Sequence, residues 1–202
     1  MEELITDADV LVIVGAWNRA ILSQEWVMQN LLSEEKNVKI EYPINSIGSL
    51  RFSTEDFSFF VLGERLVFKA LNNKEQTYKN IVAIARQLLR LLSHTPINAM
   101  GINFVYKSEQ ALTIFDSIGD TRKLVDLIGH EIKVQELTRS FSIDETLTLN
   151  LKIQSTNSAS IIDFNFNYSV KTPIDAINVF GDTDNIIINR NQFSKEILEN
   201  LI

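Results

Sequence analysis

Two segments of the chain alternate strictly between apolar and polar residues, and this pattern constrains the fold more than any other feature. The apolar positions are Leu147, Leu149, Leu151 and Ile153 in the first segment and Ile162, Phe164, Phe166 and Tyr168 in the second. Successive side chains of a strand point to opposite faces of a sheet, so the alternation predicts two strands with one buried and one solvated face. The polar stretch 155–158 predicts a hairpin between them. A hairpin alone is unstable in water, so we expect a helix at 74–92 or 192–202 to cover its apolar side.

Apolar runs and turn residues predict further strands. They lie at 10–14, 38–44, 57–62, 65–70, 98–107 and 132–143. Pro43 favours a place at the edge of a sheet for the second of these. Gly63-Glu64 predicts a hairpin with a type II′ turn, because glycine stands first in a two-residue loop. A phase change in the last segment indicates a β-bulge near Gln135-Glu136.

Apolar residues at helical spacing predict helices. They lie at 24–32, 74–92, 109–117, 121–128 and after residue 191. Ser23 can cap the first helix, and Asn73 can cap the long second helix, whose apolar stripe is typical of a core-facing amphipathic helix.

The order of these elements predicts an α+β fold, with antiparallel sheet built from hairpins and covered by helices on one face. We expect one domain over residues 1–202. The segments 37–107 and 130–202 both contain three strands followed by a helix, which suggests two similar halves, although no residue-level repeat accompanies them.

One part of the chain resembles a family of uncharacterised bacterial proteins. The resemblance rests on Phe57-Ser58-Phe59-Phe60-Val61-Leu62-Gly63-Glu64-Arg65-Leu66-Val67-Phe68, on the long helix, and on Ile97-Asn98-Ala99-Met100-Gly101-Ile102-Asn103-Phe104. Those proteins are similar in carrying a hairpin, a long helix and a strand with the pattern small-Gly-Ile/Leu-x-Phe/Tyr. The resemblance implies a fold for this part of the chain and carries over no catalytic residue.

Composition excludes several classes of protein. Hydrophobic residues make up 45% of the chain, so it is not a disordered protein. The net charge is −7, which disfavours nucleic acid as a partner because phosphate binding depends on Lys and Arg. Lys79, Arg86 and Arg90 are spread along one helix, and we expect them to form a solvated helix face. The chain has no cysteine and no apolar run long enough for a membrane span, so we expect a cytoplasmic protein without membrane contact.

The turn Trp17-Asn18-Arg19 is a candidate binding site. It follows a predicted buried strand, where loops often carry binding groups. Trp offers a stacking face, Asn offers a donor and an acceptor, and Arg offers fixed donors for an anion. The alternative is that Trp17 packs in the core and Arg19 pairs with a surface carboxylate.

Catalytic groups are few. His130 and Glu131 are candidates for an acid–base pair, with structural roles as the alternative. Neither histidine has the spacing of a metal site, and the sequence contains no P-loop, nucleophile elbow or dinucleotide fingerprint. We therefore expect no metal and no cofactor, and we favour a non-enzymatic role, with an enzyme as the alternative.

The polar positions of the last strand form a second candidate binding site. Asp163, Asn165 and Asn167 lie on one face, beside Asn150 and Lys152 of the preceding strand. Such a face is either simply solvated or binds a partner, since asparagine both donates and accepts hydrogen bonds. In either case we expect a residue such as Asn165 to contribute little to stability, and in the second case its loss would weaken binding of the partner.

Two hypotheses about function follow. The first is a non-enzymatic bacterial or phage protein that acts by protein–protein interaction or self-assembly, most simply as a homodimer. Long strands with one polar face can leave a free edge that pairs with another chain. The second is an enzyme or small-ligand binder that uses the Trp17-Asn18-Arg19 loop.

Overall fold

The computed structural model describes residues 2–6, 8–43, 49–109, 122–130, 132–156 and 158–201. Its strands are β1 (Glu2–Leu4), β2 (Asp9–Gly15), β3 (Lys39–Glu41), β4 (Arg51–Ser53), β5 (Phe57–Leu62), β6 (Arg65–Ala70), β7 (Ile97–Ser108), β8 (Val134–Ser142), β9 (Leu147–Thr156) and β10 (Ser160–Tyr168). Its helices are α1 (Gln24–Asn30), α2 (Glu75–Leu91), α4 (Arg122–Ile128), α5 (Pro173–Phe180) and α6 (Ile186–Leu201).

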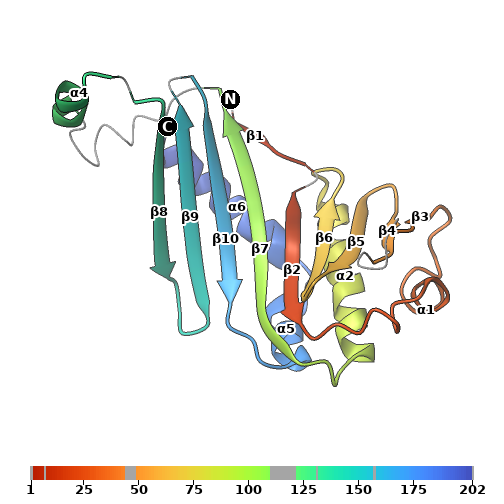
Figure 1. Ribbon diagram of the computed structural model, residues 1–202. Coiled ribbons are helices and arrows are strands. Elements are labelled where there is room, and N and C mark those ends of the chain that lie inside the picture. The colour runs from red at the N-terminus through yellow and green to blue at the C-terminus, as the bar shows by residue number, and fades with distance from the viewer. Residues whose placement is uncertain are drawn as a thin grey trace.

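The described strands form one open, antiparallel, ten-stranded sheet, in which nine strands follow the order β3-β4-β5-β6-β2-β7-β10-β9-β8 and the tenth, β1, pairs with β7 (Figure 1). The twelve-residue β7 lies in the middle. It pairs with β2 and β1 along one side and with β10 along the other. The sheet is therefore continuous from the N-terminal to the C-terminal half of the chain, and β3 and β8 are the edge strands at the two ends of the strand order.

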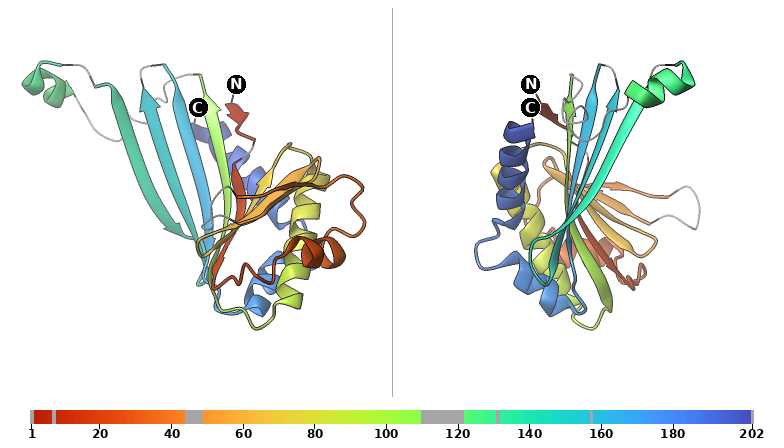
Figure 2. Two further views of the ribbon diagram at one scale, coloured as in Figure 1. Left: turned by 45° about the vertical axis from the view of Figure 1, so that its right-hand side comes forward. Right: turned by 90° about the vertical axis from the view of Figure 1, so that its left-hand side faces the viewer.

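Helices α2, α5 and α6 lie on one face of the sheet, as the right-hand view of Figure 2 shows. The side chains between these helices and the strands form the hydrophobic core. Its largest fully buried members include Phe57, Phe59, Phe68, Phe104, Phe164, Phe166 and Phe180. The predicted α+β class, with antiparallel strands covered by helices on one face, is confirmed.

The predicted hairpin of alternating strands is confirmed residue by residue. In the register of β9 and β10, Leu151 pairs with Phe164 and Leu149 pairs with Phe166. The covering helix is α6, in which the Phe193 ring lies 6.1 Å from the Phe166 ring and the Arg190 guanidinium lies 5.5 Å above it.

The second predicted hairpin, β5–β6, is also confirmed. Leu62 pairs with Arg65 across the Gly63-Glu64 loop. Gly63 has a φ of 61°, and Glu64 is not among the residues with positive φ, as a type II′ turn requires. Glycine is needed at the first position because a side chain there would be strained.

Two predictions about β8 and α2 are wrong. β8 pairs with β9 in one unbroken register, without the bulge expected near Gln135-Glu136. The phase change has a different cause: the strand begins at Val134, whose side chain lies on the open face and is 51% exposed. Asn73 does not cap α2; the Oδ1 of Asn72 accepts from the backbone N–H of Lys74 instead.

The C-terminal helices also differ from the prediction. α6 begins at Ile186, before the expected start after residue 191, and the sequence analysis did not predict α5. The signal for α5 is a capping box, in which Thr172 and Asp175 bond to each other's backbone N–H groups, with Pro173 at the first helical position. β4 was missed as well, so neither of the two proposed halves has the expected simple order. The helix expected at 109–117 lies outside the described residues.

Arg86 is not part of a solvated helix face. Its guanidinium forms an ion pair with Asp184, donates to the carbonyl of Gly181 at 2.7 Å, and lies 5.7 Å from the Phe180 ring. Its side chain is only 14% exposed. Arg86 therefore joins α2 to the turn between α5 and α6.

Truncation of Phe164 tests the packing of the sheet against α6. Phe164 is fully buried and its ring lies 5.9 Å from that of Tyr106. Phe164→Ala should lower the free energy of unfolding by about 3–5 kcal/mol, because it removes a buried ring and leaves a cavity. The control is Ile161→Ala on the open face of the same strand, where the side chain is 44% exposed. Urea denaturation measures both, and equal losses would contradict the two-faced sheet.

Candidate functional site

The structure gives separate positions to the three residues of the Trp17-Asn18-Arg19 turn. Trp17 is 7% exposed, and its Nε1 donates to the carbonyl of Ile13 at 2.9 Å. The Oδ1 of Asn18 accepts from the backbone N–H of Ala20 at 3.0 Å. Trp17 therefore packs in the core and Asn18 closes a turn, while Arg19 lines a hollow beside β4–β6.

The second candidate pair lies elsewhere. His130 is exposed and follows α4 in the chain, and α4 itself lies beyond the β8 edge of the sheet (Figure 1). Glu131 lies outside the described residues, so its role as a partner of His130 stays a prediction. Neither the hollow beside Arg19 nor the open face described below includes His130 among its described lining residues.

On the open face of the sheet, polar side chains form a continuous hydrogen-bonded row that crosses five adjacent strands. The Ser140 hydroxyl donates to Asn150 Oδ1 at 2.7 Å, and Asn150 Nδ2 donates to Asn165 Oδ1 at 2.9 Å. Asn165 Nδ2 donates to Asn103 Oδ1, and Asn103 Nδ2 donates to the carbonyl of Asp9, both at 2.6 Å. We call this set of residues the polar row.

The polar row depends on register and on one glycine. Asn165 lies directly opposite Asn103 on one side and Asn150 on the other. A Cβ on Gly101 would lie 3.1 Å from Asn165 Nδ2, closer than most side-chain contacts allow. The missing side chain at Gly101 therefore leaves room for the Asn165 amide to join its two neighbours.

The open face is hollowed around the polar row. A shallow depression of about 600 Å³ is lined by all three predicted polar residues of β10, namely Asp163, Asn165 and Asn167. It also includes Asn103 and Gly101 from β7, and Arg65 and Lys69 from β6. Sequence analysis missed these four residues because their closeness to β10 depends on strand order. The signal for Asn103 was present, since it occupies a polar phase of the strand predicted at 98–107.

Asp163 carries the main electrostatic feature of this depression. Burial against the sheet raises the pKa of its carboxyl group, and Lys152 on the neighbouring strand partly opposes this rise. Lys152 lies opposite Asp163 and also pairs with Glu136 at 3.0 Å. The depression thus offers amide donors and acceptors, the carboxyl groups of Asp9 and Asp163, and the cationic groups of Arg65 and Lys69, which suits hydrogen bonding to a partner.

The edge strand β8 presents backbone groups in the direction away from the sheet. The N–H of Ile143 donates to the carbonyl of Leu147 at 2.9 Å, so odd-numbered residues of β8 point their backbone groups toward β9. Backbone direction alternates along an antiparallel strand, so the even-numbered residues point outward. No described strand pairs with them. The outward carbonyl of Thr138 accepts instead from the guanidinium of its own neighbour Arg139 at 2.9 Å.

The two edges of the sheet are unlike. β8 is nine residues long and has exposed apolar side chains along or just beyond it, including Phe141 at 45% and Ile143 at 46%. β3 is three residues long, and its Lys39 and Glu41 form an ion pair at 2.6 Å. Short, charged edges resist pairing with another chain, whereas long ones with apolar side chains invite it.

Other classes of site find no support in the described residues. No three His, Asp or Glu side chains among them come together as ligands for a metal ion. No helix in this part of the chain has the length and apolar composition needed to cross a membrane. Comparison with models of protein families, with curated proteins and with solved structures gives no match to this chain.

The polar row should stabilise the sheet, contrary to the expectation from sequence that its polar residues contribute little. Asn165→Ala removes two cross-strand hydrogen bonds and leaves Asn103 Oδ1 and Asn150 Nδ2 without a protein partner, which should cost about 1–2 kcal/mol. Asn167→Ala is the matched control on the same strand and face, because Asn167 is exposed and outside the row, and it should cost less than about 0.5 kcal/mol. Equal free energies of unfolding in urea would show that the row does not stabilise the sheet.

The raised pKa of Asp163 makes a prediction about pH. Above the folded-state pKa, folding keeps a carboxylate in a place that disfavours its charge, whereas below the ordinary value of 3.8 the group is protonated in both states. Asp163→Asn should therefore raise the melting temperature at neutral pH, and the gain should shrink as the pH falls through the folded-state pKa. A gain that stays constant over the whole range would point to packing rather than ionisation.

Proposed function

We propose that this is a non-enzymatic protein that acts by protein–protein interaction, and that its first partner is a second copy of itself. The observation that carries the proposal is the outer edge of β8, whose nine residues are paired on one side only within the described structure. Addition of a strand at such an edge supplies main-chain hydrogen bonds without any prior rearrangement.

A two-fold axis at Thr138 gives the pairing that fits best. Antiparallel pairing about this central residue of β8 uses all nine residues of both strands, and it joins the outward-facing even-numbered positions. An axis at Arg139 would instead place two guanidinium groups directly opposite each other, which disfavours it.

The side chains of β8 support this register on both faces of the sheet. On the open face, Ser140 would lie opposite the partner's Glu136, so the polar row would continue into the second subunit. On the helix-covered face, the exposed ring of Phe141 would lie over the partner's Gln135, and Arg139 would lie over the partner's Leu137. Each contact occurs twice, as in any isologous interface.

We infer a bacterial or phage protein of a reducing, cytoplasmic compartment, which the cysteine-free sequence and the resemblance over 57–104 support.

Thr138→Pro tests the proposed assembly. The N–H of Thr138 points away from β9, so proline removes a donor from the outer edge without breaking a β8–β9 hydrogen bond. By size-exclusion chromatography with light scattering, the wild-type chain should have twice the monomer mass. Thr138→Pro should shift it to monomer, with a dissociation constant raised about tenfold or more.

Thr138→Val is the matched control, because it changes the side chain at the axis and keeps the N–H. It should remain a dimer. A wild-type chain that is monomeric at its highest soluble concentration would overturn the proposal, and so would a Thr138→Pro variant that is folded and still dimeric.

A further inference from the structure

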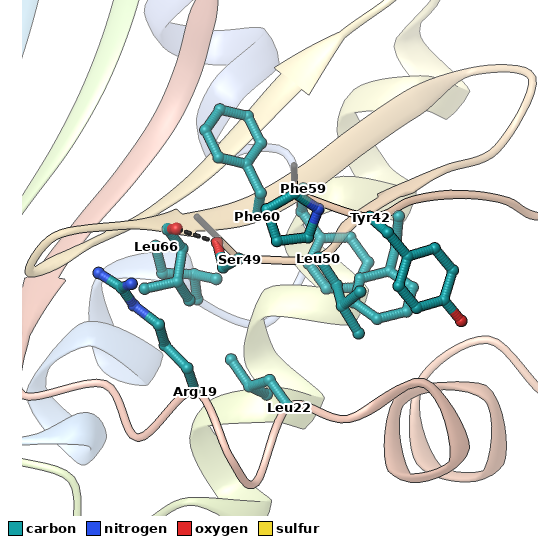
Figure 3. Close-up of a pocket in the computed structure, with 11 residues that line it drawn as sticks. Arg19, Leu22, Tyr42, Ser49, Leu50, Phe59, Phe60 and Leu66 are labelled. Atoms are coloured by element: carbon teal, nitrogen blue, oxygen red, sulfur yellow. Dashed lines mark hydrogen bonds between the residues drawn. The ribbon is translucent and has the colours of Figure 1, made fainter. Parts of the chain in front are cut away.

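A hollow of about 370 Å³ lies beside β4, β5 and β6, in the half of the sheet opposite to β8 (Figure 3). The described residues that line it are Arg19, Leu22, Tyr42, Pro43, Ser49, Leu50, Phe52, Phe59, Phe60, Val61 and Leu66. Its size and its mostly apolar lining are those of a small-molecule site.

The apolar wall is built by cross-strand pairs. Phe52 and Phe59 lie opposite each other on β4 and β5, and their rings stack at 5.3 Å between centroids. Leu66 on β6 lies opposite Val61 on β5. Phe60 lines the hollow with its backbone, because its ring points away from the hollow in Figure 3. That ring lies 4.3 Å from the guanidinium of Arg51.

Among the described lining residues, Arg19 is the one that carries a charge. In Figure 3, Arg19 and Leu22 extend from the loop after β2 toward the strands. The hydroxyl of Ser49, another polar group of the lining, donates to the carbonyl of Val61. The hollow therefore combines an apolar wall with one guanidinium.

The loop that carries Arg19 is held by hydrogen bonds on both sides of it. Before it, Trp17 is fixed to the carbonyl of Ile13 and is almost fully buried. After it, the side chain and the carbonyl of Asn18 accept from the N–H groups of Ala20 and Ile21, at 3.0 and 3.1 Å. Fixing a loop in advance lowers the entropic cost of binding, so the backbone at Arg19 is preorganised.

We propose that this hollow binds a small apolar molecule with one anionic group, an aryl or alkyl carboxylate. The apolar part would contact Leu22, Leu50 and the Phe52–Phe59 pair. The carboxylate would accept hydrogen bonds from Arg19, whose planar fork of donors matches a carboxylate. The roles that sequence analysis gave jointly to the Trp17-Asn18-Arg19 turn are divided in this way: Trp17 and Asn18 position the loop, and Arg19 binds the ligand.

A matched pair of probes tests the site. 2-Naphthoate and its uncharged relative 2-naphthamide have the same apolar ring and differ in charge at one end. In isothermal titration calorimetry, the wild-type chain should bind 2-naphthoate saturably at one site per chain, and 2-naphthamide about tenfold more weakly, because a charged hydrogen bond is lost.

Four variants assign the binding to the hollow. Arg19→Gln should weaken 2-naphthoate about tenfold and leave 2-naphthamide unchanged, whereas Arg90→Gln, an equal charge change on the exposed surface of α2, should alter neither. Leu50→Trp should fill the hollow and abolish binding of both probes while circular dichroism and the melting temperature show a folded chain. Leu22→Phe is a second filling variant if Leu50→Trp does not fold.

Several outcomes would overturn the inference. They are no saturable binding of 2-naphthoate by the wild-type chain, equal affinity for the two probes, or binding that survives both filling variants. The site and the β8 edge are at opposite ends of the strand order, so Thr138→Pro should leave probe binding unchanged, and each proposal can fail without the other.

Discussion

The pairing of β7 with β2 on one side and β10 on the other holds this molecule together. Residues from distant parts of the sequence meet there: Ile102 lies between Leu11 and Phe166 in the register. All three side chains are fully buried beneath the helices. An apolar contact of this kind can form only when both pairings have the correct register, since a slip by one residue would turn the apolar set toward solvent.

On the opposite face of the sheet, polar residues fix the same strand register. Asn103 is next to Ile102 in the chain, and it joins the amide of Asn165 on one side to the carbonyl of Asp9 on the other. Hydrogen bonds between directly opposite side chains are lost after a slip by two residues, which the apolar pattern alone would tolerate. The core and the polar row together therefore specify one register, with Gly101 providing the space for the amides.

Sequence patterns predicted the parts of this structure that depend on residues close together in the chain. The β9–β10 hairpin and the β5–β6 hairpin were predicted because period-two alternation and a glycine-first loop act within a few residues. The α5 capping box at Thr172 and Asp175 was also local, and it was overlooked. The polar side chains of the open face could be predicted only in part: Asn150, Asn165 and Asp163 share one hairpin, whereas Asn103 and Lys69 come close to them through strand order, which no local pattern contains. Arg86 was misassigned for the same reason, since its partner Asp184 is far away in sequence.

The difference between the two edges of the sheet has a consequence for how far association can proceed. A sheet with two receptive edges would add copies at both ends and grow into a fibre. Here β3 is short and carries paired charges, so growth in that direction is blocked. Contact between two copies through β8 would cover the long edge strand of each copy. The combined sheet would then end in the short strand β3 on both sides. Association would then be self-limiting and closed at two, and the length of β8 would not become a route to amyloid-like polymerisation.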